Sequence, residues 1–115
     1  MQNIVFLDRQ SLRAELRAPS FAHEWTEHVQ TRPDQVVERL QHATVAISNK
    51  VPIRRDTLAQ LPNLKLIAMA ATGYDVIDTE ACRERGVAVA NIRNYAVHTV
   101  PEHAFALIFA LRRNL

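Results

Sequence analysis

Short apolar runs alternate with segments of helical periodicity along this chain. Runs of strand length are bounded by polar residues, prolines or glycines, which is typical of buried strands. The predicted strands span residues 4–7, 25–29, 43–47, 64–69 and 87–90. The run at 25–29 is the least apolar, so it predicts the weakest strand.

Between these runs the apolar positions recur at helical spacing. We expect short helices over residues 11–17, ended by Pro19, and over 54–60, broken by Pro62. A third helix begins near Thr31, with a proline in its first turn, and continues to residue 40. A fourth is capped by Asp78 or Thr79 and stops at Gly86. The last opens at Pro101 and has an apolar face formed by Ala104, Leu107, Ile108 and Leu111.

Alternation of strand and helix, with short and continuously apolar strands, is typical of α/β proteins. The pattern predicts a flavodoxin-like doubly wound parallel sheet covered on both faces. The last helix ends without glycine or proline, as if it were cut rather than finished.

Composition narrows the class of protein further. At 115 residues the chain has the size of one domain, and its net charge of +2 with scattered arginines argues against nucleic-acid binding. No apolar run approaches the roughly 20 residues that cross a membrane. The single cysteine, Cys82, excludes an internal disulfide, reads as a buried apolar side chain, and fits a cytoplasmic protein.

Several kinds of site are missing. The only glycines, Gly73 and Gly86, are too far apart for a dinucleotide fingerprint or a phosphate-binding loop. No cysteine and histidine cluster has metal-ligand spacing, so no metal site is expected. His98 and His103 do not share a helical face, and no nucleophile elbow is present.

Polar residues gather where the predicted strands end. They are Asp8, the segment 48–50, the pair 72–73 and the loop 91–95. In a doubly wound sheet these ends meet at one edge, where ligands bind. Lys50 adds a positive charge, and amides near Thr72 and Gly73 could cradle a small carboxylate or phosphate. Alternatively, these are solvated loop residues, and Gly73 only serves a turn that needs a positive φ or a sharp bend.

Several segments in order resemble the D-isomer-specific 2-hydroxyacid dehydrogenases, most closely the glycerate dehydrogenase (hydroxypyruvate reductase) branch. They are residues 49–52 (NKVP), 61–65 (LPNLK), 71–78 (ATGYDVID), 85–91 (RGVAVAN) and 99–103 (TVPEH). The resemblance covers essentially the whole chain. It departs from the family at Pro101, where alanine is common, although proline is tolerated at a helix start.

The resemblance implies a two-domain enzyme. Residues 1–99 would be the N-terminal part of its substrate domain, and residues 100–115 would begin the crossover helix to an absent Rossmann domain that binds NAD or NADP. The glycine-rich fingerprint and the catalytic Arg, Glu and His would lie beyond Leu115. This chain alone should therefore hold no cofactor, supply no catalytic residue and be inactive.

Carried over residue by residue, the resemblance places the substrate carboxylate on the backbone amides of Thr72 and Gly73. Asn49, Lys50 and Tyr95 would complete the substrate side of the cleft. Thr72 would also lie near the nicotinamide. Val100 would approach the cofactor.

The implied activity is hydride transfer between NAD(P)H and a small 2-oxo acid such as hydroxypyruvate or glyoxylate. The alternative is a stand-alone flavodoxin-like module that binds a partner or small anion without redox chemistry. In either case the uncovered apolar face of the last helix predicts a homodimer or larger species.

Overall fold

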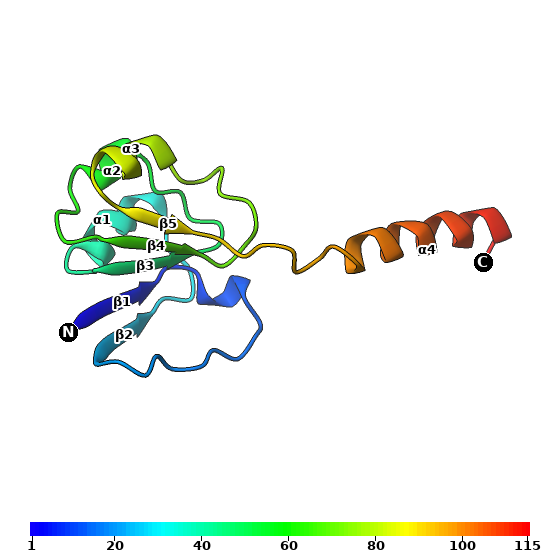
Figure 1. Cartoon of the computed structure of the whole chain (residues 1–115), viewed down its shortest axis with the longest axis horizontal. Helices are drawn as coiled ribbons and strands as arrows, with labels where there is room; N and C mark the ends of the chain where they lie inside the picture. The colour runs from blue at the N-terminus through cyan, green and yellow to red at the C-terminus, as the bar shows by residue number, and fades with distance from the viewer.

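A parallel sheet of five strands, in the order β2-β1-β3-β4-β5, forms the centre of the molecule (Figure 1). The computed structural model describes residues 1–115. The strands are β1 (Gln2–Phe6), β2 (His23–Glu27), β3 (Val45–Ser48), β4 (Leu66–Met69) and β5 (Ala88–Ala90). This order, which reverses direction between β1 and β3, is that of flavodoxin-like sheets, so the predicted fold class is confirmed.

Helical segments connect the strands. They are the 3-10 turns η1 (Arg9–Ser11) and η2 (Pro33–Gln35) and the helices α1 (Val36–Leu40), α2 (Arg55–Leu58), α3 (Thr79–Glu84) and α4 (Thr99–Arg113). No helix is both long enough and apolar enough to cross a bilayer.

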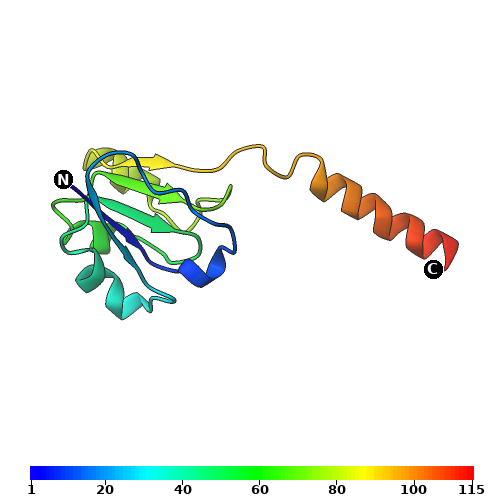
Figure 2. The same cartoon turned by 90° about the horizontal axis from the view of Figure 1, so that it is seen from below.

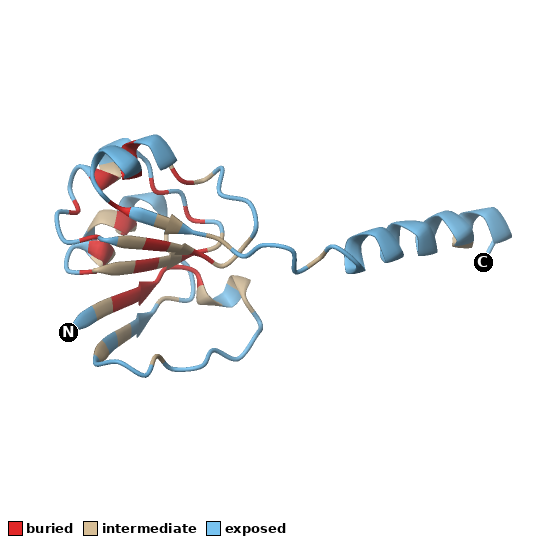
Figure 3. Ribbon diagram, in the orientation of Figure 1, coloured by how far each residue is buried: buried red, intermediate tan, exposed pale blue.

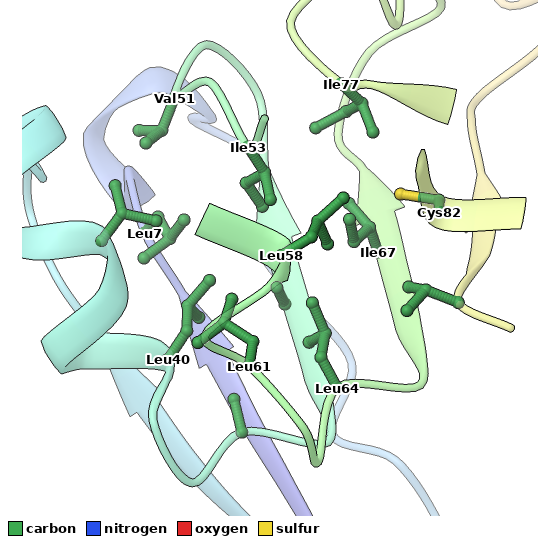
Figure 4. Packing of buried hydrophobic residues seen from close by; sticks show 14 of the residues in the cluster. Leu7, Leu40, Val51, Ile53, Leu58, Leu61, Leu64, Ile67, Ile77 and Cys82 are labelled. Atoms are coloured by element: carbon green, nitrogen blue, oxygen red, sulfur yellow. The ribbon is translucent and has the colours of Figure 1, made fainter. Parts of the chain in front are cut away.

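One face of the sheet carries the hydrophobic core. Side chains that alternate along the strands, such as Val5, Ala46 and Ile67, join residues of α1, α2 and α3 in a single buried cluster. Figure 4 shows this packing, with Leu40, Leu58 and Cys82 approaching the strands from their helices. All three short helices therefore cover the same face, as right-handed crossovers running in one direction across the sheet require.

The opposite face is covered unevenly, because Ile4 and Phe6 of β1 are buried there while β3 and β4 are more open. Ile47 and Ala68 on that face are half-buried. Next to them lies a hollow of ≈ 550 Å³ lined by Met1, Gln2, Phe21, Ala22, Val45 and Leu66. The physical reason is the β1–β2 connection, which runs in the other direction across the sheet and contains η1 but no α-helix.

The predicted helix over residues 11–17 does not form. The chain leaves η1 at Leu12 in an extended conformation (φ −123°, ψ 116°). The Arg9 guanidinium donates to the carbonyls of Leu12 and Ala14, which stabilises the extended path. The second strand is also displaced from the prediction, since it begins at His23 and ends at Glu27.

The start of α1 differs in detail from the prediction. Arg32, not Thr31, precedes the η2 turn, and its backbone N–H is satisfied by the Gln35 side chain at 3.0 Å. Thr31 instead donates its hydroxyl proton to the carbonyl of Leu7 at 2.6 Å. At α3 the predicted cap is confirmed, because the Asp78 carboxylate accepts from the backbone N–H of Ala81 at 2.9 Å.

The two glycines have different roles. Gly86 has φ +71°, as expected of a glycine that ends a helix. Gly73 does not have a positive φ, and an added Cβ would meet only a carboxylate oxygen of Asp75 at 3.5 Å. The turn at Gly73 therefore needs no glycine for its own conformation, and the reading based on a positive φ is wrong.

Helix α4 projects away from the sheet on an extended linker (Figures 1 and 2). Because of it, the radius of gyration is 17.3 Å, against ~13 Å for a compact domain of this length. Nearly the whole helix is exposed (Figure 3). It begins at Thr99, two residues before Pro101, and Asn114 in the left-handed conformation caps its end, where the sequence offers neither glycine nor proline.

Candidate functional site

The carboxylate of Asp8 fixes the loop that follows β3. Asp8 lies just after β1, and only 6% of it is exposed. Its two oxygens accept hydrogen bonds from the backbone N–H groups of Asn49 at 3.0 Å and Lys50 at 2.8 Å. The Ser48 hydroxyl closes the same loop by donating to the carbonyl of Val51 at 2.8 Å. The ends of β1 and β3 are thereby held together at the carboxyl edge of the sheet.

The side chain of Asn49 is held as firmly as its backbone. Its Nδ2 group donates to the Ser11 hydroxyl oxygen at 3.1 Å and to the Ser11 carbonyl at 3.4 Å. Ser11 in turn donates its hydroxyl proton to the carbonyl of Asp8 at 2.7 Å. Asp8, Ser11 and Asn49 thus form one closed polar network.

The turn after β4 is anchored through its carbonyls. Asn91 Nδ2 donates to the carbonyl of Thr72 at 2.8 Å, and Arg54 Nη1 donates to the carbonyl of Asp75 at 2.8 Å. In contrast, the backbone N–H groups of Thr72 and Gly73 donate to no atom of the chain. Both residues are exposed. The turn therefore presents free donors, which favours an anionic ligand.

A short parallel bridge between Ile53 and Ile77 supports this turn from the side. The backbone N–H of Ile53 donates to the carbonyl of Val76 at 3.0 Å, and the N–H of Asp78 donates to the carbonyl of Ile53 at 3.1 Å. The loop after β3 and the loop after β4 thus form one connected unit.

A hollow of ≈ 360 Å³ opens at this edge of the sheet. Its lining residues are Ser11, Leu12, Asn49, Ala70, Ala71, Ile92 and Tyr95. Two of the residues singled out from sequence, Asn49 and Tyr95, therefore share a hollow, and Ala71 directly precedes the turn at Thr72. Most of the lining is apolar, and Asn49 and Ser11 supply polar atoms at one side.

The other predicted site residues lie apart from this hollow. Lys50 is exposed and lines a neighbouring, mostly polar hollow of ≈ 460 Å³ together with Asp8 and Gln30. Val100 lies on α4, is 63% exposed, and shares no hollow with Thr72. The two residues that the resemblance places toward the cofactor, Thr72 and Val100, thus lie on separate elements.

Two further sequence expectations concern a metal site and the chemical role of Cys82. The chain contains no group of three histidine, cysteine or carboxylate side chains placed to hold a metal ion. Cys82 is buried, and burial raises the pKa of its thiol, with Asp78 adding to the effect. A raised pKa lowers the thiolate fraction, which makes Cys82 a poor nucleophile.

Sequence reasoning missed several residues of this edge. The sequence pattern predicts Ser11 and Leu12 within a helix and Arg54 at a helix start, and it places none of them near the site. Their contacts connect segments 21 to 38 positions apart in the chain, and no local pattern signals such pairings. Asn91 and Ile92 belong to the loop that sequence placed at this edge, but nothing distinguished them within it.

The comparison with known proteins agrees with this fold. Residues 4–113 match the family model of the D-isomer specific 2-hydroxyacid dehydrogenase catalytic domain. The chain is 58% identical over 113 residues to a glycerate dehydrogenase of Methylorubrum extorquens, covering 97% of this chain and 36% of that protein.

Solved structures give the same result. A pyruvate reductase of Chlamydomonas reinhardtii superposes with a TM-score of 0.75 at 28% identity, over 98% of this chain and 35% of that one. An acyclic imino acid reductase in complex with NADPH and D-Arg has a TM-score of 0.77 at 22% identity, over 98% of this chain and 38% of that one, which supports the fold alone.

This chain spans about a third of the length of the curated relatives that it matches (36% of each of the first two). The relatives are dehydrogenases and reductases by name. The matched residues run almost from end to end and include the turn at Thr72 and the hollow beside it. The chain belongs to the D-isomer-specific 2-hydroxyacid dehydrogenase family.

Proposed function

We propose that residues 1–99 are the N-terminal part of the substrate domain of an NAD(P)-dependent 2-hydroxyacid dehydrogenase. Residues 100–115 would begin the helix that crosses into the cofactor domain. The whole protein would reduce a small 2-oxo acid, with hydroxypyruvate and glyoxylate as the expected substrates. Family membership and the 58% identity to a glycerate dehydrogenase support this assignment.

The observation that carries the proposal is the pair of free amides at Thr72 and Gly73. A carboxylate accepts hydrogen bonds only, so two adjacent donors without partners form a suitable cradle for it. The carbonyls of the same turn are occupied by Asn91 and Arg54, which keeps the donor side available.

The remaining substrate residues would act from the adjoining loops. Asn49 and Tyr95 line the hollow beside the turn and would contact the rest of the substrate. Lys50 would add positive potential from the neighbouring hollow, and this attracts anions over distances of about 10 Å at ordinary salt. The acid–base residue would come from another part of the protein, as the family resemblance implies.

When bound, NAD(P)H would supply the hydride. This chain would contribute only Thr72 and Val100 toward it, and the two lie on separate elements. The glycine content of the chain does not provide a pyrophosphate-binding turn. The cofactor site would therefore belong to the portion of the protein outside these residues.

Steady-state assays of the full-length protein test the proposal. Oxidation of NADH and of NADPH would be followed with hydroxypyruvate and with glyoxylate, and the 115-residue chain would be assayed in parallel. We expect turnover by the full-length protein and none by the chain alone. A full-length protein that binds 2-oxo acids but oxidises neither nucleotide would contradict the proposal and favour a binding module without redox chemistry.

A further inference from the structure

The amide side chain of Asn49 has a fixed orientation. Its Nδ2 group donates to two atoms of Ser11, the hydroxyl oxygen at 3.1 Å and the carbonyl oxygen at 3.4 Å. The backbone N–H of the same residue is bound by the Asp8 carboxylate. Rotation of the amide would break two hydrogen bonds and bring its oxygen against the Ser11 carbonyl, so the geometry opposes it.

This orientation leaves one group of Asn49 available. Its Oδ1 atom accepts no hydrogen bond within the chain, yet it is not a buried orphan, since every buried side-chain polar atom has a partner. The residue is half-buried and lines the hollow beside the turn at Thr72. Within the Asn49 amide, Oδ1 is therefore the atom left without a partner in the chain, and it is the one we expect to accept a hydrogen bond from an occupant of the hollow.

The rest of the lining is mostly apolar, and Tyr95 is another residue that brings a polar group to the hollow. Leu12, Ala70, Ala71 and Ile92 present apolar surface. Ser11 has its hydroxyl proton committed to the Asp8 carbonyl. A substrate with a hydroxyl donor beside its oxo group would satisfy Oδ1, whereas a methyl group in the same place would leave it unpaired.

Building on the proposed function, we propose that Asn49 determines substrate specificity by accepting a hydrogen bond from the 3-hydroxyl of a 3-hydroxy-2-oxo acid. Ser11 is the positioning residue that keeps the acceptor directed at the substrate. The substrate class is thereby narrowed to hydroxypyruvate-like acids, in preference to pyruvate, which differs only by the missing hydroxyl. A site built to bind a hydroxyl rejects the analogue that lacks it, because its own polar atom is left unpaired.

The test compares kcat/KM for hydroxypyruvate and pyruvate in the full-length protein. We expect the wild type to prefer hydroxypyruvate and Asn49→Leu to reduce that preference about tenfold, the value of one hydrogen bond to a partly exposed acceptor. Ser11→Ala should reduce it less, because Asn49 keeps its second bond to the Ser11 carbonyl. For glyoxylate, which has no third carbon, kcat/KM should change little in either Asn49→Leu or Ser11→Ala. Asn63→Leu makes the same change on an exposed turn far from the hollow and should leave the preference unchanged.

A binding measurement covers the case in which Asn49→Leu fails to fold. In the isotope-labelled wild type, D-glycerate should shift the side-chain amide resonances of Asn49, and D-lactate should leave them in place. Equal use of the two oxo acids by the wild type, an unchanged preference in Asn49→Leu, or equal shifts with both hydroxy acids would overturn the inference. A protein that reduces none of the three oxo acids would instead overturn the proposed function itself, and this inference with it.

Discussion

The carboxylate of Asp8 accepts a 2.8 Å hydrogen bond from the backbone N–H of Lys50, a residue 42 positions later in the chain. This contact joins the end of β1 to the loop after β3 at the point where the strand order reverses. Asp8 is nearly inaccessible to solvent. A buried carboxylate with two backbone donors contributes both to the stability of the fold and to the shape of the site.

Replacing Asp8 by asparagine should lower the free energy of unfolding by about 1–3 kcal/mol. The asparagine amide group would face one of the two backbone donors that the carboxylate now accepts. Urea denaturation followed by circular dichroism would measure the loss. Asp56→Asn, an exposed residue of α2, is the matched control and should change stability by less than about 0.5 kcal/mol. Equal stability of the two variants would contradict the role given to Asp8.

Replacement of each glycine by alanine should affect the stability of the fold differently. Gly86→Ala places a side chain at φ +71° and should cost about 1–2 kcal/mol. Gly73→Ala should be neutral or stabilise the fold by about 0.4–1 kcal/mol, because its backbone is unstrained and the unfolded chain loses freedom. Thermal unfolding of both variants checks this pair of predictions.

The same substitution at Gly73 separates folding from binding. In the full-length protein Gly73→Ala should raise KM for the 2-oxo acid, since a methyl group would stand beside the proposed carboxylate cradle. A variant that is stable and has an unchanged KM would argue against the cradle without affecting the fold.

Arg55 links α2 to α3 through Glu84, with 2.6 Å between Nη1 and Oε2. The hydrogen bond and the charge of Arg55 lower the pKa of Glu84 below its ordinary 4.5. The folded state therefore binds this proton less readily than the unfolded state. The resulting stability is present above about pH 4.5 and is lost as the pH falls through the folded pKa.

Glu84→Gln should accordingly be slightly less stable than the wild type near neutral pH and equally stable in acid. Both partners are about half exposed, so the difference should be small and should shrink further in high salt. Thermal midpoints over a pH series would measure it, with Glu24→Gln on β2 as a control that has no ion pair. A difference that persists at low pH would contradict this assignment.

Helix α4 should cause the isolated chain to self-associate. Its apolar side chains are exposed, Leu111 to 83% and Ile108 to 55%. A single helix of this length is marginal in water, so association would also stabilise it. Light scattering coupled to size exclusion should detect a dimer or larger species, which Ile108→Glu with Leu111→Glu should convert to a monomer.

Ala106→Glu adds one glutamate on the opposite side of α4 and is the control, to be compared also with Ile108→Glu alone. It should leave the association largely intact. A wild-type chain that is a monodisperse monomer at all concentrations would show that α4 does not drive association.

Much of the fold could be predicted from interactions between residues that lie close together in the sequence. The apolar runs at β1, β3 and β4, the Asp78 cap and the glycine at residue 86 all act over short distances, and the structure confirms them. The helix predicted over residues 11–17 does not form, because hydrogen bonds from Arg9 stabilise an extended path there. The periodicity of the sequence does not encode those bonds.

The α/β class, the parallel strands and the family could all be predicted from the sequence, since they follow from hydrophobic periodicity and from motifs in order. The sequence also predicted that polar residues would meet at the carboxyl edge. Three outcomes came only from contacts between distant segments. Helices α1, α2 and α3 cover one face of the sheet. Asn49 and Tyr95 share a hollow while Lys50 lies outside it, and Ser11 orients Asn49. Those outcomes depend on which strands become neighbours, and on hydrogen bonds between segments tens of residues apart, so no local pattern in the chain could specify them.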